Sequence, residues 1–294
     1  MKKSFLFLCL MAVAVALSSV SCEHISDSDA VGGKKSLTFS TFTLEEGSYE
    51  NVTKAAVSDV ITKLDFALYT LDGSTYTLYR LIRQDNADDG FGSIRVEDVD
   101  YGEYAVVVIG HKCSVHATMD SPQAINFGGK VAETFSYYAK LTVNGATATS
   151  QQVELNRVTS KFKIWCNDTQ PVDIKTFEFV VSGGSTLFDA TRGLAPAADA
   201  DDRTVTIDGT SYSGVADVVY SFQTFLPSTE ASITVEANAK NSAGEVLYSN
   251  TFEDAPMKVN RETIYRGDFY VGSSVPSFSV TINDEWDTPY QTTF

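Results

Sequence analysis

The residue types best suited to chemistry lie together in residues 111–116, where two histidines flank a cysteine. The imidazoles of His111 and His116 and the thiol of Cys113 are ligand types that Zn²⁺ prefers. Their spacing matches no zinc motif, however, and no fourth ligand follows at a recognisable distance. The remaining histidine, His24, stands alone near the N-terminus. We therefore predict no metal site, and interpret the stretch as a surface loop after a buried strand.

The rest of the sequence has no pattern of an active site. It contains neither a Gly-x-Ser-x-Gly elbow nor a glycine-rich phosphate loop, so nucleophilic hydrolysis and phosphate binding are not predicted. A pair of carboxylic acids has no local spacing rule, which leaves an envelope hydrolase as the least favoured alternative. We predict that the protein is not an enzyme, with no catalytic residue and no cofactor.

Two acidic stretches, 85–90 and 199–202, raise the question of calcium. In an EF-hand loop that began at Asp85, the third and twelfth positions would be Ala87 and Val96, whose side chains cannot bind the ion. A calcium site of less regular spacing is retained as an alternative at both stretches. Solvated acidic loops are the more common use of such sequences.

The N-terminus has the signature of export. Two lysines precede an apolar run over residues 5–17, and small residues follow up to Cys22. This combination predicts a secretory signal peptide over residues 1–21, because the run is short for a membrane span. Ser19-Val20-Ser21-Cys22 resembles a lipobox, so we predict that Cys22 becomes the lipid-bearing first residue. The alternative is an uncleaved transmembrane anchor.

Residues 22–34 are predicted to form a lipidated acidic tether. The acidic patch that follows Cys22, with Asp27 and Asp29, resembles the surface-export tether of Bacteroidetes lipoproteins. A plain acidic linker is an equal alternative. Gly32 and Gly33 close the segment and favour flexibility.

Composition limits the class of partner. The chain has 294 residues and a formal net charge of −16, so it lacks the basic surface that nucleic-acid binding requires. Its 18 Phe and 14 Tyr are enough for a sizeable core, which argues against disorder. Cys113 and Cys166 remain beyond the lipobox, and the sequence leaves open whether they form a disulfide in the oxidising envelope.

Apolar residues alternate with polar ones along most of the chain, which predicts strands with one buried face. Leu64, Phe66 and Leu68 alternate before a hairpin signal at Asp72-Gly73, and 105–109 is a continuous apolar run that fits a strand buried on both faces. Strands at this spacing predict an all-β protein of two tandem antiparallel β-sandwiches, 35–156 and 157–294. Apolar pairs also flank the integrin-type tripeptide 266–268, which places it in a strand or at its edge rather than in an adhesion loop.

Several segments, in order, resemble the Bacteroidales fimbrillin family, the subunits of type V pili and their membrane anchors. One is the lipoprotein signal itself, and another is the junction Leu155-Asn156-Arg157-Val158-Thr159-Ser160-Lys161-Phe162. The other segments are Lys63 to Gly73, Asp100-Tyr101-Gly102-Glu103-Tyr104, Val259-Asn260-Arg261-Glu262-Thr263 with Gly267, and Asn283-Asp284-Glu285-Trp286. The resemblance implies two transthyretin-like domains and a structural role in a surface fimbria at the outer membrane.

The resemblance also implies how such subunits join. In the family, a protease removes the first strand and a neighbouring subunit fills the groove, which is β-augmentation. Here the candidate first strand is Ser36 to Leu44, and the implied partners are other fimbrial subunits and, through Cys22, outer-membrane lipid. The family's stalk subunits are cleaved after Arg, but no Arg occurs between Cys22 and Arg80. Lys54 is the candidate processing site; without cleavage the chain would be an anchor or accessory subunit.

A surface glycan-binding lipoprotein is the alternative function, because outer-membrane lipoproteins built of β-sandwiches often bind polysaccharide. It predicts a platform of exposed aromatic rings. Tyr137, Tyr138 and Trp286 are the candidates, although core packing is the more common use of such residues.

Overall fold

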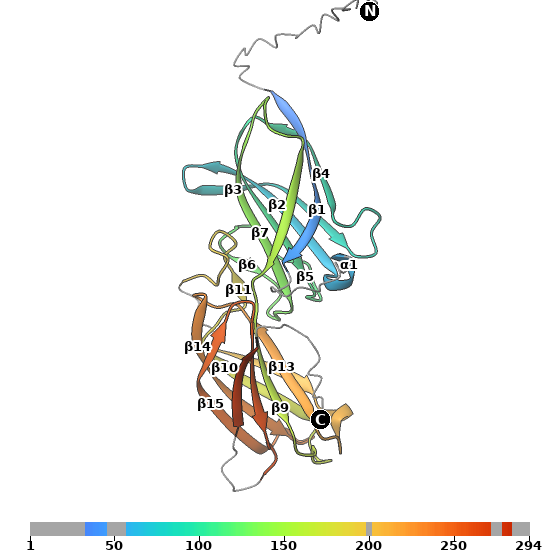
Figure 1. Ribbon diagram of the computed structural model, residues 1–294, viewed down its shortest axis with the longest axis vertical. Helices are drawn as coiled ribbons and strands as arrows, with labels where there is room; N and C mark the ends of the chain where they lie inside the picture. Colours follow the sequence, from blue (N-terminus) through green and yellow to red (C-terminus); the bar gives the residue numbers. More distant parts are fainter. Residues whose placement is uncertain (1–32, 46–56, 198–201, 272–277, 284–294) are drawn as a thin grey trace, which may run out of the picture. The chain divides into compact units, whose positions relative to one another are not determined.

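The computed structural model describes residues 33–45, 57–197, 202–271 and 278–283 (Figure 1). The predicted signal peptide, most of the tether, Cys22 and Lys54 lie outside these residues, as do 199–201 and Trp286. The chain divides into two compact units, Met1–Gly32 and Gly33–Phe294. The fold described below is that of the second unit. Across the described ranges, no helix has the length and apolar character of a membrane span.

The first half of this unit is one seven-stranded sheet of order β3-β2-β5-β7-β8-β1-β4 (Figure 1). The β7–β8 pairing is confined to two residue pairs, and side chains from the strands on both sides of it form one core, called the enclosed core below. A short helix α1 and a two-residue strand β6 complete this half. The elements are β1 (Lys34–Glu45), α1 (Val57–Val60), β2 (Lys63–Asp72), β3 (Thr75–Asp85), β4 (Ser93–Asp100), β5 (Gly102–His111), β6 (Ile125–Asn126), β7 (Thr134–Val143) and β8 (Ser150–Arg157).

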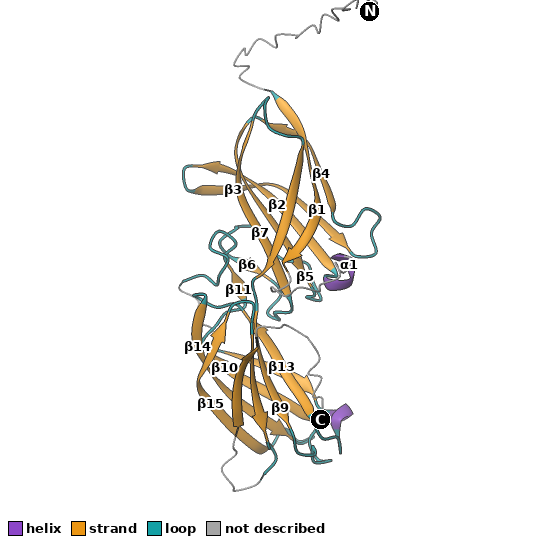
Figure 2. Cartoon of the chain, in the orientation of Figure 1, coloured by secondary structure: helices purple, strands orange, loops and turns teal. Residues whose placement is uncertain are grey.

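The second half has two four-stranded sheets, β12-β10-β14-β15 and β13-β9-β16-β17, whose facing side chains share one core. Figure 2 shows that strands dominate both halves. The elements are β9 (Ser160–Cys166), β10 (Thr176–Ser182), β11 (Leu187–Phe188), β12 (Arg203–Asp208), η1 (Thr210–Tyr212), β13 (Val218–Thr224), β14 (Glu230–Lys240), β15 (Val246–Lys258), β16 (Glu262–Gly267) and β17 (Phe278–Asn283).

The all-β prediction is confirmed, but the sheets are not purely antiparallel. β1 runs parallel to β8, and β16 runs parallel to β9. A parallel pair needs a long crossover connection, and both pairs join strands that are far apart in the sequence. Alternation within one strand shows which face is buried but contains no information on the direction of a distant neighbour.

Several local predictions are confirmed. β2 ends at Asp72 and β3 begins at Thr75, and Gly73 adopts the positive φ of +60° that the hairpin turn needs. In β5, Val106 and Val108 point into one core while Val107 points into another, so the strand is buried on both faces.

The second of these cores lies on the outer face of β2 and β5. Loop residues 113–127 cover it together with side chains from the second half, including Phe188 and Phe225. The rings of Phe127 and Phe225 are 5.4 Å apart, and β6 pairs with β11, which places one strand of each half in the same small sheet. The two halves therefore share buried apolar surface, which resists their separation.

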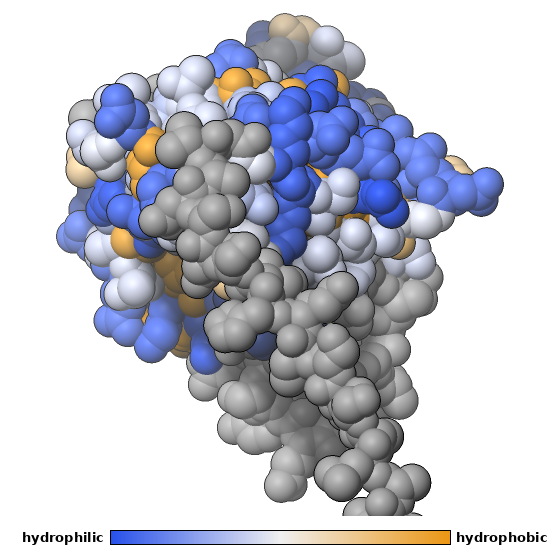
Figure 3. All heavy atoms as spheres, turned by 90° about the horizontal axis from the view of Figure 1, so that it is seen from above, coloured by the Kyte–Doolittle hydropathy of each residue, from blue (hydrophilic) through white to orange (hydrophobic). Residues whose placement is uncertain are grey.

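The face seen in Figure 3 is mostly hydrophilic, with hydrophobic atoms between the hydrophilic ones. Val115 and Val172, with 48% and 65% exposure, are examples of large apolar side chains in water. Scattered residues of this kind are normal on soluble proteins and mark no site by themselves.

Candidate functional site

The candidate first strand occupies an interior position in its sheet. β1 lies between β8 and β4, parallel to the first and antiparallel to the second. Phe39, for example, is in register with Ile94 on one side and Gln151 on the other. The register against β8 shifts between Ser40 and Thr43, as it does at a β-bulge or a similar irregularity. Loss of β1 would leave two unpaired strand edges.

β1 also supplies part of the core. Leu37 is fully buried and Phe39 is 2% exposed, and both belong to the apolar cluster enclosed by the seven-stranded sheet. The ring of Phe39 lies 4.9 Å from that of Phe66 on β2, at an interplanar angle of 47°. Burial of each such side chain is worth about 1.5–3 kcal/mol. The strand is thus a structural part of the domain.

The N-terminal end of β1 is fixed by polar contacts. Lys35 Nζ donates to the carbonyl of Gly145 at 2.9 Å, and Lys34 Nζ lies 3.8 Å from Asp100 Oδ1. The backbone N–H of Tyr101 donates to the carbonyl of Gly33 at 3.0 Å. The strand is therefore held at its entry as well as along its length.

The prediction of a surface loop after a buried strand is confirmed at Lys112, Ser114 and Val115, which are exposed, and is wrong at His111 and Cys113. β5 extends through His111, which is fully buried, and Cys113 is 3% exposed. The reason is Asp65, a buried carboxylate on β2 that the sequence analysis did not single out. His111 Nε2 and His116 Nδ1 each lie 2.8 Å from an oxygen of Asp65, and the backbone N–H of Ala117 donates to it at 2.8 Å.

Asp65, His111 and His116 offer ligand atoms that all lie within 4.8 Å of one another, which reopens the metal hypothesis. The hydrogen bonds oppose it. The backbone N–H of Cys113 donates to His111 Nδ1 at 3.2 Å, so Nε2 carries the ring hydrogen and donates to Asp65. Arg83 Nε lies 3.6 Å from the same carboxylate. The hydrogen bonds of Asp65 hold the segment after β5 against β2.

The acidic stretch 85–90 is engaged in local contacts. Asp85 forms an ion pair with Lys63, and its other oxygen lies 3.5 Å from His116 Nε2. The hydrogen bond from Lys63 is the main cause that lowers the pKa of Asp85 below its usual value, with His116 adding to the effect. Asp88 Oδ2 accepts the backbone N–H of Asp85 at 2.8 Å. Two of the carboxylates proposed for a loose calcium site thus already have partners.

The tripeptide 266–268 lies at the end of a strand, as predicted, because β16 includes Arg266 and ends at Gly267. The guanidinium carbon of Arg266 is 4.3 Å from the centroid of the Trp165 ring, and Nε donates to Asn167 at 2.8 Å. Asp217 lies 3.6 Å from Nη2. These contacts hold the side chain against its own sheet.

Tyr137 and Tyr138 do not form the aromatic platform of the alternative function, and they pack against cores, the more common use of such residues. Tyr137 and Tyr138 are consecutive residues of β7, so they point to opposite faces of the sheet. Tyr137 packs against the enclosed core, whereas Tyr138 packs against the outer one. The hydroxyl of Tyr138 is 3.0 Å from that of Tyr76. Two rings on opposite faces cannot stack on the same sugar.

Cys113 and Cys166 are both free thiols. Cys113 belongs to the outer core on β2 and β5, and Cys166 belongs to the core of the second half. Burial is the main cause that raises the pKa of each thiol above its usual value. A buried, protonated thiol is inert.

Comparisons with known proteins place this fold in a family. The model of a family described as fimbrillin-A associated anchor proteins Mfa1 and Mfa2 matches residues 32–292. No curated protein matches the sequence.

Solved structures share the fold at low identity. A candidate polysaccharide-binding protein from Bacteroides thetaiotaomicron is 10% identical, with a TM-score of 0.52 and coverage of 85% of this chain and 96% of that one. A candidate adhesin from Bacteroides ovatus is 10% identical, with a TM-score of 0.50 and coverage of 84% and 95%. The fimbrial anchor protein Mfa2 from Porphyromonas gingivalis is 9% identical, with a TM-score of 0.46 and coverage of 86% and 98%.

Proposed function

Because the chain belongs to the family of fimbrillin-A associated anchor proteins, we propose that it is a structural lipoprotein of a surface fimbria, of the anchor or accessory type. The observation that carries the proposal is the interior position of β1, which is paired on both sides and contributes Leu37 and Phe39 to the core. A subunit that keeps this strand has its groove already filled. It can therefore terminate a row of subunits that exchange strands.

The proposed architecture is two tandem transthyretin-like β-sandwiches, 35–156 and 157–294. Separate cores within the two halves support this division. The last strand of the first half ends at Arg157 and the next begins at Ser160, so the connection between the proposed domains is very short. The shared core at β6 and β11 would then be the interface between them.

We propose that Cys22 bears the lipid and that the protein is exposed at the surface of the outer membrane. The support is the signal pattern in the sequence, with its lipobox-like Ser19-Val20-Ser21-Cys22. The proposed tether, 22–34, would join this lipid to β1, whose first residue is Lys34. The membrane would thus be linked directly to the strand on which the anchor role depends.

The proposed partners are other fimbrial subunits, joined by β-strand complementation. β3 and β4 are the terminal strands of the seven-stranded sheet, and β-augmentation uses such edges. Lys54 lies between β1 and α1 in the sequence, and we propose that it is not cleaved. Cleavage there would detach β1 covalently and turn the chain into a stalk-type subunit.

The alternative role in glycan binding draws no support from its predicted platform, because Tyr137 and Tyr138 point to opposite faces of β7.

Intact mass and N-terminal analysis of the protein from its native outer membrane tests the anchor proposal. We expect a chain that begins at lipidated Cys22 and contains Lys54 within an unbroken sequence. A chain that begins at Ala55 without lipid would overturn the proposal, because β1 would then be a removable strand. As a matched comparison, a Cys22→Ala variant should lose the lipid mass and leave the membrane fraction.

A further inference from the structure

The sheet β13-β9-β16-β17 has an outer face that takes no part in the core of the second half. Alternate residues of β9 point into that core, so the residues between them point outward. Residues in register on neighbouring strands share a face, so the outer face continues across β16. The middle of the face consists of Lys161, Lys163 and Trp165 on β9 and of Glu262, Ile264 and Arg266 on β16.

Side chains in the middle of this outer face are buried. Glu262 and Ile264 are 1% and 7% exposed, and Ile264 belongs to none of the three apolar cores formed by the described residues. The side chains of Lys161 and Lys163 are 12% and 17% exposed. A sheet face outside the core is normally solvated, and lysine and glutamate are rarely buried to this degree. The burial therefore indicates that a further segment covers the middle of the face.

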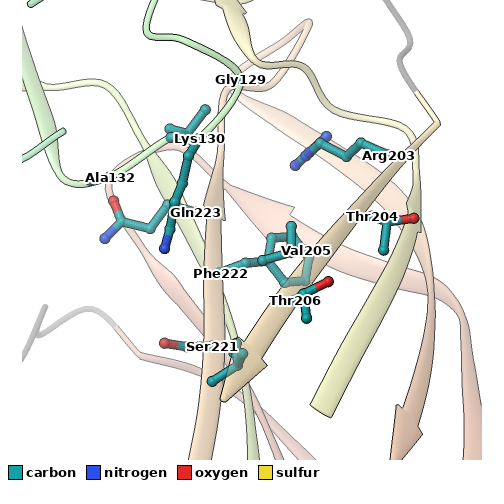
Figure 4. A pocket seen from close by; sticks show the side chains of 12 residues that line it. Gly129, Lys130, Ala132, Arg203, Thr204, Val205, Thr206, Ser221, Phe222 and Gln223 are labelled. Atoms are coloured by element: carbon teal, nitrogen blue, oxygen red, sulfur yellow. The ribbon is translucent and has the colours of Figure 1, made fainter. Parts of the chain in front are cut away.

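The margins of the outer face, in contrast, are open. Val219 is 39% exposed on β13, and Ser279 and Thr281 are exposed on β17. A pocket of about 320 Å³ reaches the β13 margin at Ser221 and Gln223 (Figure 4). A smaller one, of about 100 Å³, reaches Ser279 and Thr281 at the other margin. The covered strip is formed by two strands about 5 Å apart, which suits one extended segment rather than a folded domain.

The covered strip is partly charged and partly apolar. Glu262 Oε1 lies 2.5 Å from Lys163 Nζ and 3.4 Å from Lys161 Nζ. The two ammonium groups and the carboxylate have a summed charge of +1, which favours an anionic segment. Ile264, beside them, offers apolar surface. A segment that complements the strip therefore combines carboxylates with a large apolar side chain.

The chain leaves the sheet close to this strip. Asn283, the last residue of β17, is in register with Glu262, which is in register with Lys161. Neighbouring strands are about 4.8 Å apart, so this row places Asn283 about 10 Å from Lys161. Three residues of extended chain span up to about 10 Å. Residues that follow Asn283 and turn back can therefore reach β16 and β9.

The sequence after β17 has the composition that the strip favours. It begins with Asp284-Glu285-Trp286-Asp287, in which three carboxylates surround one large aromatic side chain. We propose that residues 284–294 bind to the outer face of their own sheet, along β16 and β9. The acidic pair 284–285 lies over the two lysines of β9, and the indole of Trp286 lies on Ile264. This inference goes beyond the anchor role and involves no residue of β1.

Fluorescence of Trp286 in the full chain tests the contact, because the sequence has only two tryptophans. Trp165→Phe leaves Trp286 as the single indole and keeps an aromatic ring next to Arg266. We expect the emission of Trp286 to be blue-shifted in the native protein. Its Stern–Volmer constant for quenching by acrylamide should be several times smaller than in urea.

Charge reversal after β17 tests the proposed ion pairs. In the Trp165→Phe background, Asp284→Lys with Glu285→Lys should raise the native quenching constant to the value in urea, because like charges then meet at the strip. Asp89→Lys with Glu103→Lys, at exposed positions in the first half, makes the same change in net charge and should leave quenching unchanged. Circular dichroism of each variant confirms that the sheets are retained.

Three results would overturn the proposal. Equal quenching of Trp286 in the native and unfolded protein would leave the outer face to a separate partner. Protection that survives the lysine pair at 284–285 would rule out the charge contacts. Protection that increases with protein concentration would assign the segment to the outer face of a second copy.

Discussion

Glu133 and Arg157 form a buried ion pair, with 2.6 Å between Oε1 and Nη2 and with each side chain 6% exposed. The other oxygen of Glu133 lies 2.6 Å from Lys112 Nζ. Arg157 also donates to Asn260 Oδ1 at 3.2 Å, and its guanidinium lies 4.8 Å from the centroid of the Phe135 ring. Glu133 thus holds Arg157 at the end of β8, and Arg157 in turn contacts the turn before β16.

Glu133→Ala should lower the free energy of unfolding by about 3–5 kcal/mol, because it removes the buried carboxylate that pairs with both Arg157 and Lys112. Urea unfolding followed by tryptophan fluorescence measures the change. Glu103→Ala is the control, since Glu103 is exposed and should change stability by about 0.5 kcal/mol or less. Equal losses in the two variants would contradict the role of the ion pair.

Asp65→Ala should destabilise the fold by a similar amount, about 3–5 kcal/mol, because His111, Ala117 and Arg83 lose their common partner. Asp89→Ala, at an exposed position in the loop after β3, should have little effect. We also expect Zn²⁺ to leave the unfolding midpoint of the wild-type protein unchanged. A rise in the midpoint that Asp65→Ala abolishes would show that the cluster binds metal after all.

Phe39→Ala should cost about 3–5 kcal/mol, because it opens a cavity beside Phe66 in the enclosed core. Thr38→Ala, the neighbouring position on the opposite face of β1, should cost about 1 kcal/mol or less. Chemical unfolding of both variants measures the difference. If the two substitutions cost the same, β1 does not pack as described.

The pH dependence of stability should reveal the Asp85 contacts. Their effect lowers the pKa of Asp85 in the folded state below its unfolded value of about 3.9. The stabilisation is therefore complete above that unfolded value and is lost as the pH falls through the folded value. The advantage of the wild type over Asp85→Asn should be present at pH 7, begin to fall below about pH 4, and disappear once the pH is below the pKa of Asp85 in the folded state. Salt should weaken it, because Asp85 is solvated. An advantage that persisted in acid would contradict the assignment.

The two thiols should be unreactive in the native protein. Burial raises the pKa of Cys113 and Cys166, so little thiolate forms at pH 8 and a reagent has no access. A thiol assay should detect both groups only after denaturation, without a reductant. Rapid native labelling of either cysteine would show that its core opens, and a missing thiol after denaturation would indicate a disulfide.

The sequence predicted those parts of the fold that depend on neighbouring residues alone. The alternation of Leu64, Phe66 and Leu68 and the turn at Asp72-Gly73 gave β2 and its hairpin, because side-chain period and turn conformation are local properties. The continuous apolar run of β5 likewise indicated burial on both faces. These signals do not depend on where the strand lies in the sheet.

The missed features depend on residues that are distant in the sequence. Asp65 contacts His111 and His116, which are 46 and 51 positions away, so no local pattern indicated that His111 is buried against a carboxylate of β2. The parallel pairing of β1 with β8 is equally invisible to a local pattern. An apolar strand interrupted by one carboxylate, as at Asp65, was the available hint of a buried polar partner.

The interior position of β1 has a mechanical consequence. A force applied to the chain ahead of Lys34 and directed along the strand acts across the hydrogen bonds to β4 and β8, because ladder bonds run between strands rather than along them. The two ladders then bear the load in shear, with many bonds strained together. A hairpin pulled from its open end would instead unzip one bond at a time. Tension at the N-terminal end therefore loads the sheet in shear, which resists extension better than unzipping does.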